Sequence, residues 1–472
     1  MNRLLISAAH KSSGKTTVTL GLCAALRERG HSVQPFKKGP DYIDPMWLTL
    51  AAQRPCHNLD FFLMNSAEIS AMFAQRSTGA DVALIEGNKG LYDGLDLDGS
   101  NSNAALARLL GAPIVLVIDA RGMTRGIAPL ILGYQSFEKD IRIAGVILNQ
   151  LGGSRHESKL RAVIEHYTNV PVLGALHFDP ALSIVERHLG LVPSNESSAA
   201  RDQIQAIAKR VSENVDLDRL LTISAPTTNL DACRAAATPA ATPRTSDGSP
   251  VRIGIARDAA FAFYYPGDME ALERAGATLV KFDTLKDQRL PDVDGLFIGG
   301  GFPEVQMAQL EANQALRANL RSAIDAGLPV YAECGGLMYL SRSITWKGHR
   351  HEMVGAIPAD TVMHERPQGR GYVILQENSS HPWGGISTPG CEVRAHEFHY
   401  STLANVDPAL TYAYAVKRGS GIDGQRDGLI YRNVLACYAH LRDVEANQWT
   451  ARFVDFVRRV RHPETAQRRA RS

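Results

Sequence analysis

Short apolar runs alternate with longer segments of helical period along the first half of the chain. The apolar runs are predicted strands, and the segments that follow several of them are predicted helices. The strands are expected at 4–8, 82–86, 113–119, 143–149 and 171–175, and the helices at 17–29, 125–136 and 156–168. Strands that alternate with helices predict a doubly wound, mainly parallel α/β sheet.

The alternation stops between residues 223 and 250, which are rich in Pro, Ala, Thr and Ser and have no hydrophobic period. This composition predicts a linker. Strand-like runs restart at 251–256, 296–301, 328–334 and 434–440. The chain is therefore predicted to hold two α/β domains, at 1–222 and 251–455. The remaining residues, 456–472, are basic, and a solvated helix end with a terminal tail is preferred over a nucleic-acid-binding arm.

Composition narrows the class of protein. A chain of 472 residues with 44% hydrophobic composition is long enough for two or three globular domains. The net charge of +2 is too small to favour binding to nucleic acid or to a membrane surface. The apolar runs are too short for a signal peptide or a membrane span. Six scattered cysteines without a C-x-x-C pair argue against a disulfide framework and a structural zinc site. A cytoplasmic enzyme is the expected class.

Residues 4–17, L-L-I-S-A-A-H-K-S-S-G-K-T-T, have the order strand, small-residue loop and helix. This order is typical of a phosphate-binding loop and disfavours a chance G-K-T, although Ala9 replaces the first glycine of that pattern. Backbone N–H groups of the loop are expected to bind ATP phosphates, Lys15 to neutralise them, and the Thr16 hydroxyl to bind Mg²⁺. The predicted nucleotide-binding residues are Ser12, Ser13, Gly14, Lys15, Thr16 and Thr17.

Charged residues gather in two further segments, 34–45 and 83–94. The first contains Lys37, Lys38, Asp41 and Asp44, and it is predicted to follow a strand; a solvated charged loop is the alternative. The second places Glu86 at the end of an apolar strand, with Asp93 in the loop beyond. Carboxylates at the ends of parallel strands beside a phosphate loop can hold Mg²⁺ against a triphosphate. Lysines there would attract an anionic acceptor, so phosphoryl transfer is predicted.

In the second half, residues 331–340 read Y-A-E-C-G-G-L-M-Y-L. A strand followed by Cys334 and two glycines predicts a strand–elbow–helix turn that exposes a nucleophile. The helix N-terminus is expected to lower the pKa of the Cys334 thiol and to favour the thiolate. The alternative is a buried structural cysteine.

A thiolate that attacks an amide needs a basic partner and donors for the oxyanion. His440, at the end of the last predicted strand, is the expected partner because parallel strand ends can meet in space. The expected oxyanion donors are the backbone N–H groups of Gly300, Gly301 and Gly335. His396 and His399 alternate along a strand-like run, so a hydrogen-bonded structural or substrate-facing role is preferred for them.

Together these segments resemble the cobyrinate a,c-diamide synthases, glutamine-dependent ligases of corrinoid biosynthesis. The likeness spans nearly the whole chain and rests on S-S-G-K-T-T, K-K-G-P-D-Y-I-D-P, H-N-L-D, E-G-N-K-G-L-Y-D-G, E-R-H-L-G-L-V-P, F-A-F-Y-Y-P, G-G-G-F-P-E, Y-A-E-C-G-G-L-M-Y-L and H-E-F-H-Y-S. It implies an N-terminal P-loop domain like that of dethiobiotin synthetase and a C-terminal class I glutamine amidotransferase domain. It also implies that Cys334 is the nucleophile and His440 its activating histidine.

The resemblance further implies a carbon–nitrogen ligase that amidates the a and c acetate side chains of a cobyrinate-type tetrapyrrole through acyl phosphates. Glutamine, ATP with Mg²⁺ and an anionic tetrapyrrole are the expected partners, without nucleic acid or membrane, and a homodimer is the expected assembly. The implied magnesium ligands are Thr16, Asp41 and Glu86. The implied substrate-binding residues are Lys37, Lys38, Asp41, Tyr42, Asp44 and Asp93.

Two positions depart from the family pattern. Many class I amidotransferases carry a glutamate two residues after the histidine, but Arg442 stands there, so the third member of the site is open. Lys11 stands where relatives often have Ser or Gly, which leaves open a side branch that acts on sirohydrochlorin or sirohaem. Cobyric acid synthase is disfavoured by D-Y-I-D-P and G-L-Y-D-G. A non-catalytic P-loop ATPase switch with an inert amidotransferase module is the alternative of another class, and the intact Cys334 and His440 weigh against it.

Overall fold

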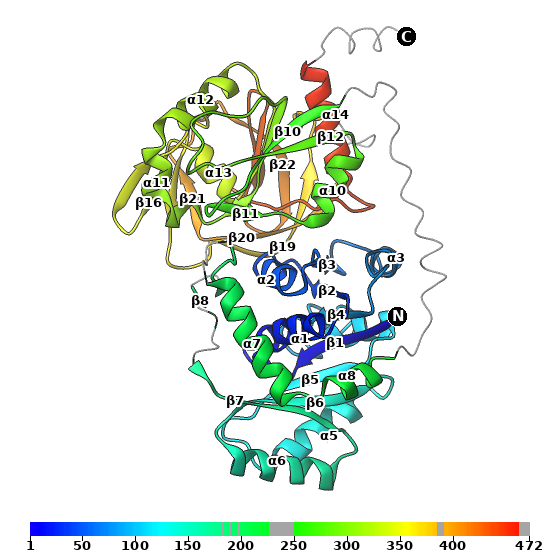
Figure 1. The fold of residues 1–472 in the computed structure, drawn as a ribbon. Coiled ribbons are helices and arrows are strands. Elements are labelled where there is room, and N and C mark those ends of the chain that lie inside the picture. Colours follow the sequence, from blue (N-terminus) through cyan, green and yellow to red (C-terminus); the bar gives the residue numbers. More distant parts are fainter. Residues whose placement is uncertain are drawn as a thin grey trace. The chain divides into compact units, whose positions relative to one another are not determined.

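The structure is a computed structural model that describes residues 1–180, 184, 186–187, 190–195, 199–225, 250–384 and 391–461 (Figure 1). The chain forms two compact units, and the division falls within the predicted linker. Most of that linker, 226–249, and the end of the predicted tail, 462–472, lie outside the described residues. Each unit is described separately below.

The first unit is built on a seven-stranded sheet with the order β3-β2-β4-β1-β5-β6-β7. All of its strand pairs are parallel, which confirms the predicted doubly wound sheet. The chain leaves the central strand β1 toward both edges, so the ends of β1, β2 and β4 form the crevice where such folds bind ligands. The strands are β1 (Asn2–Ala8), β2 (Val33–Lys38), β3 (His57–Leu59), β4 (Val82–Glu86), β5 (Ile114–Asp119), β6 (Ile143–Leu151) and β7 (Val172–His177).

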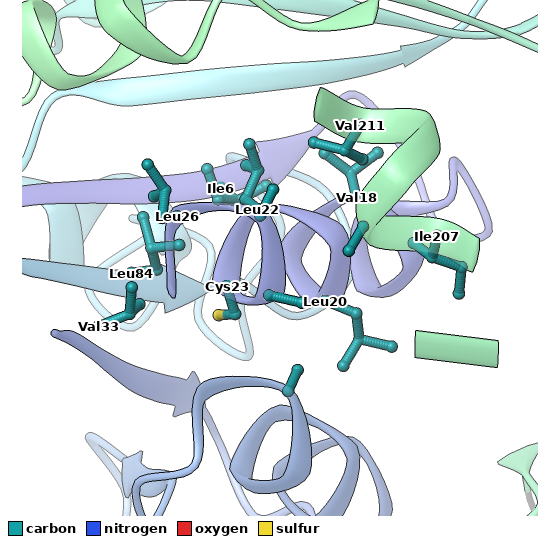
Figure 2. Close-up of a cluster of buried hydrophobic side chains, with 14 of the residues drawn as sticks. Ile6, Val18, Leu20, Leu22, Cys23, Leu26, Val33, Leu84, Ile207 and Val211 are labelled. Atoms are coloured by element: carbon teal, nitrogen blue, oxygen red, sulfur yellow. The ribbon is translucent and has the colours of Figure 1, made fainter. Parts of the chain in front are cut away.

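Helix α1 (Lys15–Glu28) is the central helix of this unit, and Figure 2 shows Val18 and Leu22 on it beside Ile6 of β1 and Val211 of α7. A side chain at Gly21 would meet the Val211 Cγ2 atom at 2.3 Å, so the glycine lets the two helices approach closely. This packing fixes the helix end that carries the phosphate loop. The other helices are α2 (Ile43–Ala52), α3 (Ser66–Arg76), α4 (Asn103–Leu110), α5 (Ile127–Phe137), α6 (Ser154–Tyr167), α7 (Ala200–Asn214) and α8 (Leu217–Ile223).

A short hairpin of β8 (Glu186–Arg187) and β9 (Gly190–Leu191) follows β7 in the first unit.

The second unit contains a nine-stranded sheet with the order β12-β10-β13-β15-β24-β23-β22-β19-β20. Its first five strands are parallel and its last four pair antiparallel, so the sheet is mixed. The strands are β10 (Val251–Ala256), β12 (Ala277–Phe282), β13 (Gly295–Ile298), β15 (Val330–Glu333), β19 (Gly369–Glu377), β20 (Glu392–His399), β22 (Thr411–Arg418), β23 (Arg426–Tyr431) and β24 (Val434–Cys437).

Two predicted runs of the second unit are shorter strands than expected. The run at 296–301 breaks after Ile298, and Gly300–Gly301 forms β14, which pairs with β11 (Phe261–Phe263). The run at 434–440 is a strand only to Cys437. In both cases the residues predicted to take part in catalysis lie beyond the end of the strand. They are Gly300 and Gly301 in the first run and His440 in the second.

The remaining elements of the second unit are a four-stranded sheet and a group of helices. Helix α14 continues to Arg461, and Phe456 and Val457 are buried in the core of the unit, so the folded part extends beyond residue 455. The elements are α10 (Pro266–Arg274), η2 (Pro303–Val305), α11 (Met307–Ala312), α12 (Gln314–Asp325), α13 (Gly335–Leu340), β16 (Ser343–Trp346), β17 (His349–Glu352), β18 (Asp360–Met363), β21 (Ser401–Ala404) and α14 (Trp449–Arg461).

Candidate active sites

Cys334 lies at a sharp turn between β15 and α13, as the sequence predicted. Its backbone has φ 47° and ψ −99°, a conformation that residues other than glycine seldom adopt. Such a conformation costs on the order of 1–3 kcal/mol and persists only where the surroundings enforce it. The Cys334 N–H donates to the Cys437 carbonyl at 2.7 Å, which ties the elbow to β24. This is the geometry of a nucleophile elbow.

The glycines around the elbow allow backbone to pack against it. A Cβ atom at Gly336 would lie 2.1 Å from the Ile298 carbonyl oxygen. A Cβ atom at Gly335 would lie 3.0 Å from the Gly301 nitrogen, and one at Gly300 would lie 2.7 Å from the His440 Cε1 atom. The loop at 299–301 therefore borders both the elbow and the imidazole, and the structure brings the predicted oxyanion glycines together with Cys334 and His440.

The thiol itself is 7% exposed, and its Sγ lies 3.9 Å from the Phe398 carbonyl oxygen. Burial, with a smaller effect of Glu304, raises the pKa of the Cys334 thiol above its ordinary value. The predicted lowering of this pKa is therefore wrong for the free protein. The helix that follows has only six residues, and its N-terminus does not offset the loss of solvation. The thiol needs a base to lose its proton.

His440 is positioned by β24, the parallel neighbour of β15. His440 is 3% exposed, and its backbone N–H donates to the backbone carbonyl of His396 at 2.7 Å. The rings of His396 and His440 stack with centroids 4.9 Å apart. The His440 imidazole therefore has the Gly300 loop at its edge and the His396 ring on one face.

Glu333, which the sequence did not predict as a site residue, lies directly before the nucleophile and contacts His440. Its Oε2 is 3.2 Å from the His440 Nδ1. Its Oε1 accepts hydrogen bonds from the Tyr331 hydroxyl at 2.6 Å and from the Leu441 N–H at 2.9 Å. A carboxylate within an otherwise apolar, fully buried strand is the signal that could have identified it.

The other two histidines have partners of their own. The Tyr265 hydroxyl lies 3.4 Å from the His396 Nδ1, and the Arg442 guanidinium lies over the Tyr265 ring at 5.0 Å. His399 shares a hydrogen bond of 2.9 Å with the Ser401 carbonyl and stacks on Tyr438 at 3.9 Å. Both histidines are buried and hydrogen-bonded, as the first of their two predicted roles requires.

In the first unit, residues 10–15 form the predicted phosphate loop. Ser12 and Gly14 have positive φ of 63° and 84°, and α1 begins at Lys15, two residues earlier than predicted. The Asn149 amide donates to the Ser13 carbonyl at 3.0 Å, and a Cβ atom at Gly14 would lie 2.1 Å from that amide nitrogen. Burial lowers the pKa of the Lys15 ammonium to about 8. Asn149 is thus a support of the loop that the sequence did not reveal.

Lys37 lies among carboxylates at the end of β2, rather than in a loop after a strand as predicted. Its Nζ is 2.5 Å from Asp44 Oδ2, 2.8 Å from Glu86 Oε1 and 3.8 Å from Asp41 Oδ2. Thr16, at the start of α1, donates its hydroxyl to Glu86 at 2.6 Å. The structure therefore brings these predicted metal and substrate residues together beside the phosphate loop.

A magnesium ion at this cluster would need phosphate and water oxygens in addition to the carboxylates. Glu86 Oε2 is buried and has no hydrogen-bond partner. Burial, with the neighbouring Asp44, raises the pKa of Asp41 to about 7, and burial also raises the pKa of Glu86. Within the described residues, no group of three His, Cys, Asp or Glu side chains can hold a metal ion by itself. Mg²⁺ commonly takes one or two carboxylates and completes its shell with phosphate and water.

The other predicted substrate residues are Lys38, Tyr42 and Asp93. The Lys38 ammonium donates to Asn88 Oδ1 at 3.2 Å, and burial lowers the pKa of Lys38 to about 8. Tyr42 is the residue before α2 and is nearly buried. Asp93 accepts the Gly90 N–H at 2.8 Å and so closes its own loop.

Comparison with known proteins decides the family. Residues 5–192 match the CobQ/CobB/MinD/ParA nucleotide binding domain, and residues 252–447 match the CobB/CobQ-like glutamine amidotransferase domain. The chain is 46% identical to cobyrinate a,c-diamide synthase of Magnetococcus marinus, over 97% of each chain. The chain belongs to the cobyrinate a,c-diamide synthase family. It is also 42% identical to the synthase of Methanosarcina acetivorans (97% of this chain, 96% of the relative) and 38% identical to that of Listeria innocua (93% and 96%).

Membership of the cobyrinate a,c-diamide synthase family makes the chain a glutamine-dependent amide ligase with a nucleotide-binding domain. Each family domain lies within one of the two compact units, and each contains one of the two groups of site residues described above. Across the described residues, no helix is both long and apolar enough to cross a membrane.

Proposed function

We propose that the chain uses ATP and glutamine to amidate the a and c acetate side chains of a cobyrinate-type tetrapyrrole. The full-length likeness to synthases of that name carries this proposal. The geometry supports it, because one unit has a cysteine at a sharp turn whose neighbour Glu333 contacts His440, and the other has a phosphate loop beside buried carboxylates. Glutamine hydrolysis and carboxylate activation are thus assigned to separate units.

In the glutaminase half-reaction, the Cys334 thiol gives its proton to His440, and the sulfur attacks the side-chain amide carbon of glutamine. The N–H groups of Gly301 and Gly335 stabilise the oxyanion that forms. His440 then returns the proton to the leaving nitrogen, the C–N bond breaks, and ammonia departs. Water hydrolyses the thioester, releases glutamate and restores the thiol.

In the other half-reaction, an acetate oxygen of the macrocycle attacks the γ-phosphorus of ATP and releases ADP. This step is required because a carboxylate is a poor electrophile with a poor leaving group. Ammonia attacks the acyl phosphate carbon, the C–O bond to phosphate breaks, and loss of a proton leaves the amide. Lys15 neutralises the transferred phosphate, and Lys37 and Lys38 orient the anionic acceptor. The two acetates react in turn.

Thr16, Asp41 and Glu86 are the proposed ligands of Mg²⁺, which would neutralise charge on the β- and γ-phosphates when bound. The buried Glu86 oxygen without a partner supports this assignment. Lys37 holds Glu86 and Asp44 in place in the free protein.

Mass spectrometry of the tetrapyrrole product tests the proposal. The purified chain is incubated with ATP, glutamine and, separately, cobyrinate, sirohydrochlorin and sirohaem. Two successive acid-to-amide mass changes on cobyrinate are expected. Amidation of sirohydrochlorin or sirohaem alone would assign the same chemistry to the alternative substrate, and no amide on any acceptor would favour the non-catalytic ATPase switch.

Two variants separate the half-reactions. Cys334→Ala should lose amidation supported by glutamine and keep amidation supported by ammonium salts. Lys15→Met should lose both, because it removes a charge from the phosphate loop. Glutaminase activity retained by Cys334→Ala would remove that residue from its proposed role.

A further inference from the structure

We infer that Glu333 is the positioning residue that completes the Cys334–His440 pair, in place of the glutamate that many amidotransferases carry two residues after the histidine. The inference rests on the proposed glutaminase function of Cys334. It assigns a role to a side chain that lies one residue before the nucleophile in β15, 107 residues from His440 in the chain. Neither the family pattern nor the sequence indicated it.

The two carboxylate oxygens of Glu333 have different partners. Oε1 accepts from the Tyr331 hydroxyl and the Leu441 N–H, which fix the position of the carboxylate. Oε2 is left to face His440 Nδ1 at 3.2 Å. A carboxylate that accepts at Oε2 holds the proton of the imidazole on Nδ1, so that Nε2 carries the lone pair. The ring stack with His396 prevents the imidazole from turning away.

The position two residues after the histidine holds Arg442, whose side chain carries the opposite charge and lies over Tyr265. Two other buried carboxylates near the site have backbone partners. Asp427 accepts the N–H groups of Tyr438 and Ala439, and Asp268 accepts the N–H of Asp443. Glu333, in contrast, directs one carboxylate oxygen at the His440 ring.

The chemistry of the thiol gives this contact its importance. Burial raises the pKa of Cys334, so the thiolate forms only when His440 takes the proton. A thiolate–imidazolium pair in a dry site is stabilised by a fixed negative charge on the far side of the imidazolium. Glu333 supplies that charge, since its carboxylate is 2% exposed and already oriented. The proton remains on the imidazole, and Glu333 does not accept it.

A structural role is the alternative, because a buried glutamate with two donors would also join β15 to the segment after β24. The two roles differ in what Glu333→Gln changes. A glutamine of the same size can keep Oε1 on Tyr331 and Leu441, but it presents an amide N–H to Nδ1. That N–H favours the tautomer with the proton on Nε2, which cannot accept the thiol proton.

The test is glutaminase activity of Glu333→Gln in the full-length chain. The expected result is a decrease in kcat of about 10²- to 10⁴-fold, whose upper end is the loss seen when the carboxylate of a Ser-His-Asp triad is made an amide, with KM for glutamine changed less than about threefold. Ammonia-supported amidation should remain at the wild-type rate. The matched control is Glu377→Gln, a buried glutamate in the same unit that is paired with Arg452 rather than with the site, and it should leave glutaminase activity unchanged.

The pH dependence of Cys334 alkylation by iodoacetamide gives a second readout that a structural role would not change. In Glu333→Gln the reaction should require higher pH than in the wild type, because the imidazolium is less stable. Glu333→Asp should recover part of the activity. A Glu333→Gln protein that hydrolyses glutamine within threefold of wild type, with an unchanged alkylation profile, would overturn the inference. If Cys334→Ala loses glutaminase activity while Glu333→Gln keeps it, the inference about Glu333 fails and the proposed function of Cys334 stands.

Discussion

Replacing Lys37 by Met tests the charge cluster at the end of β2. The Lys37 ammonium contacts Asp44 and Glu86, and the exposed fractions of the three side chains are 5%, 17% and 1%. Burial alone would lower the pKa of Lys37, but these carboxylates outweigh burial and keep that pKa well above its ordinary value. Removing one partner from a buried ion pair typically costs about 3–5 kcal/mol, because the remaining charges are unpaired.

The expected loss can be measured on the first unit alone. Hydrogen exchange of peptides covering β2 and β4, followed at increasing urea, reports the free energy of unfolding of that unit. At an m value of about 3 kcal/mol/M, a loss of about 3–5 kcal/mol lowers the urea midpoint by about 1–1.7 M. Lys38→Met is the matched control, since the Lys38 ammonium donates to the neutral Asn88 side chain. It should lose no more than about 1 kcal/mol.

Magnesium gives the decisive comparison. If Lys37 and Mg²⁺ neutralise the same carboxylates, saturating Mg²⁺ should raise the urea midpoint of Lys37→Met more than that of the wild type. The physical reason is that a ligand stabilises the folded state more when it binds that state more tightly, and the variant lacks the competing ammonium. A Lys37→Met protein as stable as Lys38→Met, or one that gains no more from Mg²⁺ than the wild type, would refute the reasoning.

Three further predictions follow from individual contacts. Gly336→Ala should abolish glutaminase activity and lower the melting temperature, since its Cβ atom would lie 2.1 Å from a backbone carbonyl of β13, whereas Gly267→Ala, with no atom within 4 Å, should do neither in the same assays. Burial lowers the pKa of His381 to about 3, so its stabilising contribution is present above pH 6.5 and is lost as pH falls toward 3. Between pH 7 and pH 5 the second unit should lose about 2 kcal/mol from this group, and urea unfolding of His381→Gln should show a correspondingly weaker pH dependence. Asn149→Ala should weaken ATP binding in calorimetry without changing glutaminase activity, because it removes the hydrogen bond to the phosphate loop.

Most parallel strands of the two sheets could be predicted, because a parallel strand that is buried on both faces is usually a continuous apolar run. Strand β2, which ends in two lysines, is not such a run. The runs at 82–86 and 143–149 correspond to β4 and β6, and the latter strand continues to Leu151. Among the antiparallel strands, the strand-like run that holds His396 and His399 is β20, whereas β19, β22 and β23 were not predicted. Strands β19 and β22 mix buried and exposed positions rather than forming a continuous apolar run, and their pairing depends on contacts between distant segments.

The chemistry of the sites divides in the same way. The elbow at Cys334 and the phosphate loop at Lys15 are local conformations that depend on small residues at fixed spacing, so the sequence determined them. The raised pKa of the thiol, the contact of Glu333 with His440 and the position of Lys37 among carboxylates were decided only by the tertiary structure. Solvation and Coulomb energies depend on burial and on distances between side chains, and neither can be known until the strands have packed side by side.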